Sequence, residues 1–290
     1  MPHSEPEPRT TTGARRRTIL TALATAGTTA PLLSALAASP AHASAIGDLY
    51  ASNTELYTKL AGQEGTEFAR RYRRHEMADA SLSQTYPYHR TTIMAMHGGG
   101  IETGTSELCL AMAGYHPATF EVTPAEGPVH DYWMFEGLRS SGNRELHVTA
   151  KNCDDHVALS MAFSSLNVLS LHGCTAAQAG APATAPEAVV IGGRNAAFRR
   201  YLTEELTRAG FRTIDGATLP DLNGDHENNP CNRTMLGEGG QLELTTELRN
   251  SMFTTNTRVG RPTSTTPAFW SFTTACRTAI SRLESGQRIL

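Results

Sequence analysis

Hydrophobic and polar positions follow two different periods along most of the chain. Short apolar runs typical of buried strands recur between segments with apolar residues at helical spacing. This alternation favours an α/β fold with a mixed, mostly parallel central sheet flanked by helices. The predicted strands are Thr91–Met96, Tyr132–Phe135, Leu146–Ala150, Val168–His172, Ala188–Ile191, Phe211–Ile214 and Gln241–Thr245. The predicted helices are Thr105–Tyr115, Cys153–Ser165, Asn195–Ala209 and Ser271–Leu283.

Two segments follow neither period. Thr175–Glu187 is rich in Ala, Thr and Pro, and Asp221–Pro230 is rich in Asn, Asp, Gly and Pro. Both compositions predict surface loops. The sequence contains no internal repeat, so residues 46–290 are predicted to form a single catalytic domain.

The first 45 residues predict a cleavable export signal. An arginine cluster at Arg15–Arg17 precedes a mildly apolar stretch and a small-residue exit, with cleavage expected after Ala43 or Ala45. Arg16–Leu20 fits the twin-arginine pattern, which predicts the twin-arginine (Tat) export machinery as a partner and a secreted, extracellular product. Threonines, a glycine and Pro31 interrupt the apolar run, so we expect no stable membrane anchor.

The net charge argues against nucleic acid as a binding partner. The chain carries 25 Lys and Arg against 28 Asp and Glu, a formal net charge of −3. Losing residues 1–45 removes four arginines and two glutamates and brings the charge to −5. Without a basic run, this acidic chain is not expected to bind nucleic acid. Its five cysteines have no zinc-finger spacing, and their odd number leaves at least one thiol unpaired.

Polar residues stand at three predicted strand ends, where α/β sheets place their sites. His97 and His172 each follow an apolar run and precede a glycine. A single histidine in this context is more often a hydrogen-bonded core residue. Two of them at strand ends of one sheet could converge, and neutral imidazole suits zinc, whose catalytic sites use three protein ligands.

The third ligand is expected from Glu102, in "HGGGIE". Glycines would let the loop double back and bring this carboxylate toward His97. The rival interpretation, a phosphate loop, lacks the lysine and the glycine spacing of the known nucleotide motifs. Cys174, two residues beyond His172, is an alternative soft ligand.

Glu243 is the third polar strand-end residue. In "QLEL", strand alternation places Gln241 and Glu243 on one face and the two leucines on the other. The polar pair could simply face solvent. Alternatively, Glu243 points into the site and takes a proton from the attacking water, as metal-assisted hydrolysis requires.

Several segments together resemble the poly-γ-glutamate hydrolase family of phage-type zinc enzymes. They are "HGGGIETGTSEL", "GLRSSGNRELHVT", "SLHGC", "VVIGGRN" and "CNRT…GGQLELTTELR", in this order, between "EGTEF" and "LRNSMF". The resemblance implies a zinc-carboxypeptidase-like fold, with zinc held by His97, Glu102 and His172 and Glu243 as general base. It implies hydrolysis of γ-glutamyl amide bonds in poly-γ-glutamate. The export signal and the Thr175–Glu187 insertion depart from the phage-type pattern.

A polyanionic γ-glutamyl substrate needs local positive charge on a net acidic protein. Arginine binds carboxylates bidentately, and an arginine could also help to stabilise the oxyanion. Arg194, Arg233 and Arg249 adjoin the motifs, and Arg233 is our first candidate for the catalytic role. His147 lies in a matching segment and is a candidate substrate contact, an outer-shell residue or a structural residue.

Two other functions stay open at this point. One is a zinc amidase or carboxypeptidase that acts on peptidoglycan γ-linkages or N-acyl-glutamates. The other is a non-catalytic binder of anionic cell-surface polymer that keeps the fold without the chemistry. A degenerate binder would be expected to have lost one of the four motif residues, and all four are present.

Overall fold

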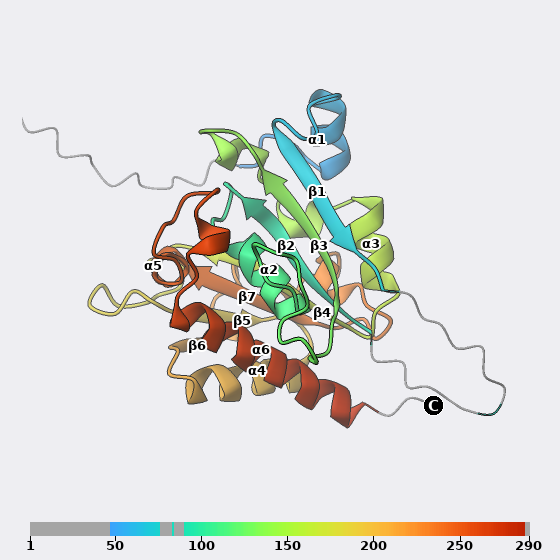
Figure 1. Cartoon of the computed structure of the whole chain (residues 1–290). Coiled ribbons are helices and arrows are strands. Elements are labelled where there is room, and N and C mark those ends of the chain that lie inside the picture. The colour runs from blue at the N-terminus through green and yellow to red at the C-terminus, as the bar shows by residue number, and fades with distance from the viewer. Residues whose placement is uncertain (1–46, 76–82, 84–89, 288–290) are drawn as a thin grey trace, which may run out of the picture. The chain divides into compact units, whose positions relative to one another are not determined.

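Seven strands form one mixed sheet in the order β1-β3-β2-β4-β7-β5-β6 (Figure 1). Strand β2 pairs in parallel with β3 and β4, β4 with β7, and β5 with β6, whereas β1 and β5 run antiparallel to β3 and β7. The strands are β1 (Phe68–Arg73), β2 (Thr91–Gly99), β3 (Asp131–Gly137), β4 (Asn167–Cys174), β5 (Val189–Gly192), β6 (Thr213–Asp215) and β7 (Gly240–Thr245). The predicted mixed, mostly parallel sheet is confirmed.

The computed structural model describes residues 47–75, 83 and 90–287. Residues Ile46–Leu290 group into one compact unit by their internal contacts. The predicted leader, residues 1–45, lies outside the described residues, so its cleavage and export stay predictions. None of the helices in the described ranges has the length and apolar character needed to cross a membrane.

Helices cover both faces of the sheet. One core joins α2, α4 and α6 to Ile93, Leu171 and Leu244, and a second joins α1 and α3 to Met94 and Trp133 on the opposite face. Figure 1 shows α2 and α6 crossing in front of the sheet. The helices are α1 (Asn53–Lys59), α2 (Thr105–Ala113), α3 (His156–Phe163), α4 (Ala196–Arg208), α5 (Thr246–Ser251) and α6 (Pro267–Gly286). Short 3-10 turns are η1 (Asn143–Leu146), η2 (Ala150–Asn152), η3 (Gly216–Thr218), η4 (Pro230–Asn232) and η5 (Arg261–Thr263).

Helices α1 and α5 were not predicted, and two strand predictions also differ from the structure. Strand β1 was not expected, because three of its six residues are arginines and its pattern is that of an exposed edge. The strand predicted at Leu146–Ala150 is wrong: this segment runs through η1, an extended link and η2. Within this link, Val148 O accepts from the His97 side chain and Thr149 N donates to the Asp48 side chain, so these two groups do not pair with a neighbouring strand.

The connections reverse direction between β2 and β4. The chain leaves β2 through α2 to reach β3 on one side, and it leaves β3 through α3 to reach β4 on the other side of β2. In open α/β sheets, ligands bind outside the carboxyl ends of the strands at such a reversal. The β2–β4 pairing ends at Ala95 and Leu171, so the two strands separate just before His97 and His172.

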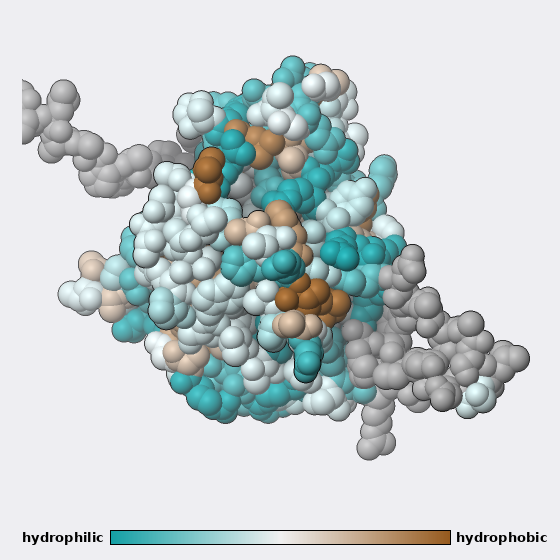
Figure 2. Space-filling model, viewed as in Figure 1, coloured by the Kyte–Doolittle hydropathy of each residue, from teal (hydrophilic) through white to brown (hydrophobic). Residues whose placement is uncertain are grey.

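All five cysteines are buried and none forms a disulfide. On the face drawn in Figure 2, polar and charged residues dominate and apolar side chains form only small patches. The two segments predicted as loops, Thr175–Glu187 and Asp221–Pro230, contain turns and coil as expected, with only the start of η4 at Pro230.

Candidate metal centre

A bulge in β2 turns His97 toward the site. Ala95 pairs with Met134 and Gly98 pairs with Glu136, so β2 uses one more residue than β3 over this interval. Simple alternation would direct His97 to the face of Ile93 and Ala95, under α2. The extra residue instead brings its ring against Val148 and His172 on the opposite face.

The glycines after His97 form a tight return turn. Glu102 N donates to His97 O at 2.8 Å, and Ile101 N donates to Gly98 O at 3.2 Å, so the loop doubles back as predicted. Of the three glycines only Gly99 has a positive φ, +65°. A Cβ on Gly99 would lie 2.4 Å from Gly137 O, and one on Gly100 would lie 2.5 Å from Asn143 Nδ2. Glycine is therefore required here for two reasons: neighbouring atoms come too close for a Cβ at Gly99 and Gly100, and Gly99 has a positive φ.

Side chains of α2 and of Arg261 hold this turn. Ser106 Oγ accepts from Gly99 N at 2.9 Å, and Thr105 Oγ1 donates to Glu102 O at 2.9 Å. The N-cap of α2 is Gly104, which has no side-chain bond. Arg261, 1% exposed, donates from Nη2 to Gly99 O at 2.9 Å. The first turn of α2 thus fixes the loop that carries Glu102.

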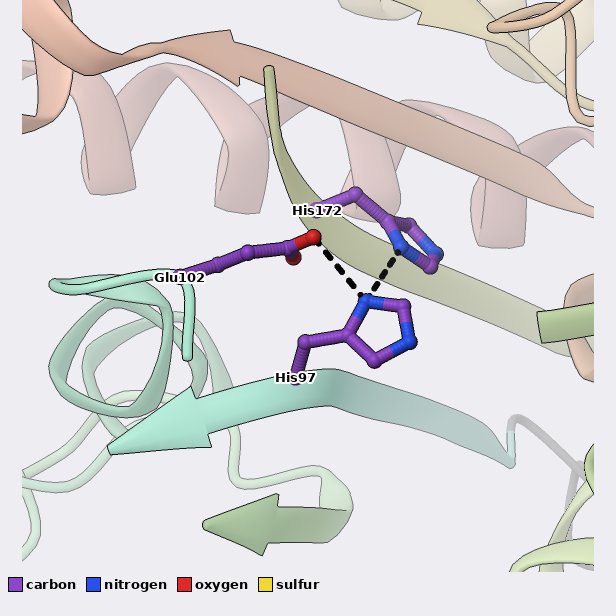
Figure 3. A group of neighbouring side chains, drawn as sticks. All are labelled: His97, Glu102 and His172. Atoms are coloured by element: carbon purple, nitrogen blue, oxygen red, sulfur yellow. Dashed lines mark hydrogen bonds and ion pairs between the residues drawn. The ribbon is translucent and has the colours of Figure 1, made fainter. Parts of the chain in front are cut away.

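His97, Glu102 and His172 converge (Figure 3). His97 Nδ1 lies 3.1 Å from Glu102 Oε1 and 3.3 Å from His172 Nδ1, and one ligand atom from each residue lies within 4.8 Å of the other two. Ligands about 2.0–2.1 Å from a tetrahedral zinc are about 3.3–3.4 Å apart, so this spacing fits zinc. Cys174 does not belong to the group and packs with Val190 and Leu222.

The hydrogen bonds around these three residues present lone pairs to one point. His97 Nε2 lies 2.8 Å from Val148 O, and because a carbonyl only accepts, Nε2 carries the hydrogen and Nδ1 is free in the neutral ring. Glu102 Oε2 accepts from Gly173 N at 2.8 Å, which orients Oε1. His172 Nε2 is buried and has no hydrogen-bond partner among the described residues.

Neutral His172 and ionised Glu102 suit a cation. Burial would lower the pKa of His97, but the charge and the hydrogen bond of Glu102 outweigh this and raise it. Burial, with the charge of His97 second, lowers the pKa of His172 to about 3, so its imidazole is neutral. Burial would raise the pKa of Glu102, but its interactions with His97 outweigh this and lower it to about 2. Two buried imidazoles and a buried carboxylate, 3%, 3% and 6% exposed, form a donor set that suits zinc.

Glu243 lies beside this group. It pairs directly with His172 across the parallel β4–β7 ladder, so both side chains point to the same face. Leu242 and Leu244 are in the opposite core, which confirms the alternation, but Gln241 and Glu243 are buried and line the pocket rather than facing solvent. Burial and then the charge of Glu102 raise the pKa of Glu243 well above its ordinary value.

A hydrogen-bonded chain orients Glu243. Gln241 Nε2 donates to Glu243 Oε1 at 3.0 Å, and Asn229 Nδ2 donates to Gln241 Oε1 at 2.7 Å. Asn229 belongs to the predicted loop Asp221–Pro230, which forms one wall of the pocket. The composition of that loop identified it as surface, but nothing in its pattern showed that it reaches Gln241.

The structure does not bring Arg194 or Arg233 into the pocket. Arg194 is exposed, and the guanidinium of Arg233 stacks on Phe163 at 4.7 Å. Arg249 is 6% exposed and lies behind Gly173, where it donates to Leu244 O and Thr103 O. Proximity in sequence to the motifs was the only basis for these three candidates.

The cations that line the pocket are Arg144 and Lys151, both exposed. Sequence reasoning missed them, although Arg144 lies in the quoted "GNRELHVT" segment. His147 also lines the pocket: its ring lies 3.9 Å from that of His97, centroid to centroid. His147 Nδ1 lies 2.6 Å from Asp48 Oδ1, and burial lowers the pKa of His147 to about 4.

The sequence is similar to those of two curated proteins of Bacillus subtilis. SPbeta prophage-derived UPF0714 protein YoqZ of Bacillus subtilis (strain 168) is 33% identical over 183 residues, 63% of this chain and 59% of the relative. UPF0714 protein YndL of the same strain is 30% identical over 187 residues, 62% of this chain and 63% of the relative. The chain thus spans about three fifths of the length of these curated relatives.

Two solved structures share the fold. A zinc-free, apo form of YndL superposes with a TM-score of 0.64 and 24% identity over 84% of this chain and 100% of that chain. A bacteriophage poly-gamma-glutamate hydrolase superposes with a TM-score of 0.67 and 22% identity over 83% of this chain and 100% of that chain. The family model described as poly-gamma-glutamate hydrolase matches residues 66–275. The chain therefore belongs to the poly-gamma-glutamate hydrolase family.

Proposed function

We propose that this protein is a zinc-dependent hydrolase that cleaves γ-glutamyl amide bonds of poly-γ-glutamate. The observation that carries the proposal is the meeting of His97, Glu102 and His172 at zinc-ligand spacing, with Glu243 opposite His172 on the next strand. Three protein ligands leave a fourth position for water or substrate, the arrangement of catalytic zinc. The family match and the zinc-free form of YndL support zinc as the metal.

The residues have separate tasks. When bound, zinc would polarise the scissile carbonyl and lower the pKa of the attacking water toward about 7. Glu243 accepts a proton from that water and delivers it to the leaving amine, and its raised pKa suits a group that must hold a proton between the two steps. Gln241 keeps the Glu243 carboxylate directed into the pocket.

Arg144 and Lys151 bind the substrate. Among the described residues that line the pocket they are the only arginine and lysine, and four carboxylates line it with them, Glu102, Asp221, Asp225 and Glu243. A γ-glutamyl chain carries a carboxylate on each residue, so cations at the pocket mouth would hold the carboxylates that flank the scissile bond. Arg144 and His147 line the same pocket.

Incubation of the purified protein with poly-γ-glutamate, followed by product sizing, tests the proposal. We expect shortening of the polymer that stops with a chelator and returns with zinc, and about one zinc per chain by metal analysis. His97→Ala should lose both the polymer shortening and the bound zinc. His116→Ala, which removes an imidazole outside the pocket, should keep both. An intact polymer beside cleavage of an N-acyl-glutamate would favour the amidase alternative. An intact polymer without any cleavage would favour a binder.

We also propose that the protein is exported through the twin-arginine route. The Arg16-Arg17 pair and the small-residue exit at Ala43 to Ala45 support this. Cell fractionation tests it: replacing both arginines with lysine should retain the uncut chain inside the cell. Export that is unaffected by this replacement would contradict the route.

A further inference from the structure

We propose that Asp48 is a positioning residue of the metal centre, an inference that rests on the proposed zinc site. Its carboxylate bridges two residues of one segment: Oδ1 accepts from His147 Nδ1 at 2.6 Å, and Oδ2 accepts from Thr149 N at 2.6 Å. Between them stands Val148, whose carbonyl accepts from His97 Nε2 at 2.8 Å. The Asp48 carboxylate therefore holds His147 and Thr149, the two neighbours of Val148. The carbonyl of Val148 in turn fixes the orientation of His97.

The carbonyl of Val148 sets the tautomer of His97. With the hydrogen on Nε2, the lone pair of Nδ1 points toward Glu102 and His172. If the 147–149 segment moved, His97 would lose the Val148 carbonyl as acceptor for Nε2–H and could place its hydrogen on Nδ1, which blocks a metal. The ring of His147 also lies against His97, 3.9 Å between centroids, and limits its rotation. Outer-shell bonds of this kind tune metal affinity.

The segment that carries Asp48 is itself fixed to the domain. Tyr50 and Leu56 are buried in the same apolar core as Val148. Thr54 N donates to Asp154 Oδ1 at 2.8 Å, and Tyr57 OH donates to Asp155 Oδ2 at 3.0 Å. Residues 48–57 thus form a strap along residues 147–155, and the strap gives Asp48 a defined position rather than that of a loose terminus.

The strap precedes the residues that the family model matches. That match runs from residue 66 to residue 275, after both Asp48 and α1. The ligands His97, Glu102 and His172 lie within the matched residues, whereas Asp48, which holds the 147–149 segment, lies before them.

A comparison of two carboxylates in the full chain tests the inference. Asp48→Ala removes the bonds to His147 and Thr149. Asp154→Ala is the matched control, since it also removes a carboxylate that accepts a backbone N–H between strap and domain, but one bonded to Thr54 rather than to His147 and Thr149. Zinc affinity is measured by competition with a chelator. We expect about tenfold weaker binding for Asp48→Ala and a change below about twofold for Asp154→Ala.

A second measurement does not depend on zinc. The His97 Nε2–H bonded to Val148 O should give an exchange-protected ring resonance in the metal-free protein by NMR. We expect it to vanish in Asp48→Ala and to persist in Asp154→Ala. Asp48→Asn, which keeps the acceptor for Thr149 N but offers an amide N–H to His147, should show an intermediate loss and replaces Asp48→Ala if that variant does not fold.

The outcomes separate the two proposals. Wild-type zinc affinity together with a retained resonance in Asp48→Ala would overturn the positioning role. Equal losses in Asp48→Ala and Asp154→Ala would also overturn it, because they would indicate general loosening of the strap. If the wild-type chain binds no zinc but only Asp48→Ala loses the resonance, the proposed function fails and the positioning role of Asp48 stands.

Discussion

At the scale of single residues, the site depends on pairs that adjacent strands set opposite each other. Glu243 and His172 share one register position, and the bulge before Gly98 brings His97 to the same face. The proposed base and two of the proposed ligands are thus positioned by strands, whose backbones are hydrogen-bonded in the sheet, rather than by loops. Positions defined in this way vary little, which favours the fixed geometry that proton transfer needs.

Glu243→Gln should separate metal binding from chemistry. The amide keeps the size and the pocket position of the carboxylate but cannot accept the proton, so we expect unchanged zinc content and hydrolysis lower by about 10²–10⁴-fold. Metal analysis and polymer sizing on the same preparation measure both. Retained hydrolysis would remove Glu243 from the role of base.

His130 should make the fold sensitive to acid. It is 5% exposed, and burial, helped by the charges of Arg277 and His75, lowers its pKa from 6.5 to about 3. The unfolded chain therefore takes up a proton at a pH where the folded chain does not. The stability that His130 contributes is complete above pH 6.5 and is lost as the pH falls toward 3.

Urea unfolding at pH 7.5 and pH 5 measures this loss. Between these values the wild-type chain should lose about 2 kcal/mol more than His130→Gln, from 1.36 kcal/mol for each pH unit below the unfolded pKa. His156→Gln, at the exposed start of α3, controls for removal of an imidazole. Equal losses in the wild type and His130→Gln would contradict the prediction.

At the scale of elements, sequence pattern predicted strands and helices better than it predicted their ends and links. The strand-end residues His97 and His172 were identifiable because apolar runs stop at them, and Glu243 because period-two alternation includes it. The return of Glu102 was expected from the glycines alone. The bulge at His97 was not predictable, since it exists only in the register of β2 against β3.

The links escaped prediction for a related reason. Residues 146–150 alternate like a strand, but their backbone partners are His97 and Asp48, which are 51 and 101 residues away from Val148 and Thr149. Arg144 and Lys151 flank that segment. They line the pocket because the segment runs along it through η1 and η2. The arginines chosen from sequence adjacency, Arg194 and Arg233, are in motif segments whose side chains turn elsewhere.

The turn after β2 should tolerate no side chain at Gly99. Gly99 and Gly180 have nearly the same φ, +65° and +67°, but a Cβ on Gly180 meets nothing within 4 Å, whereas one on Gly99 meets Gly137 O at 2.4 Å. Gly180→Ala should cost about 1–2 kcal/mol of unfolding free energy from the backbone alone. Gly99→Ala should cost about 1–3 kcal/mol more from the clash.

Thermal unfolding and zinc content distinguish the two glycine variants. The extra cost at Gly99 corresponds to a Tm lower by about 2–4 °C for each kcal/mol. Because the turn carries Glu102, zinc affinity should fall in Gly99→Ala only. Equal Tm values and equal zinc binding would show that the close approach to Gly137 does not constrain the site.

At the scale of the whole molecule, an acidic protein is expected to bind a polyanion. Long-range repulsion opposes the approach, but salt screens it beyond about 8–10 Å, so charges at the pocket decide binding. Both cations of the described pocket, Arg144 and Lys151, belong to the 143–152 segment, and residues 220–226 line the pocket as well. Specificity for an anionic chain then depends on local placement rather than on the net charge of −3.

Removing Arg144 and Lys151 together should raise KM for the polymer without a comparable change in kcat. Exposed ion pairs contribute about 1 kcal/mol or less, so we expect a rise of about fivefold for each cation. The double variant Lys59→Ala/Arg200→Ala removes the same charge outside the pocket and should leave KM near the wild-type value. A similar KM in both double variants would rule out the two pocket cations as substrate contacts.

The buried, unbonded cysteines have a consequence for where this chain can fold. No covalent crosslink ties its strands, and burial raises the pKa of every thiol, so none is a ready nucleophile for oxidation. Completion of the fold requires no oxidant. A domain without disulfides can reach its native state under reducing conditions, as the proposed export of a folded protein by the twin-arginine route would require.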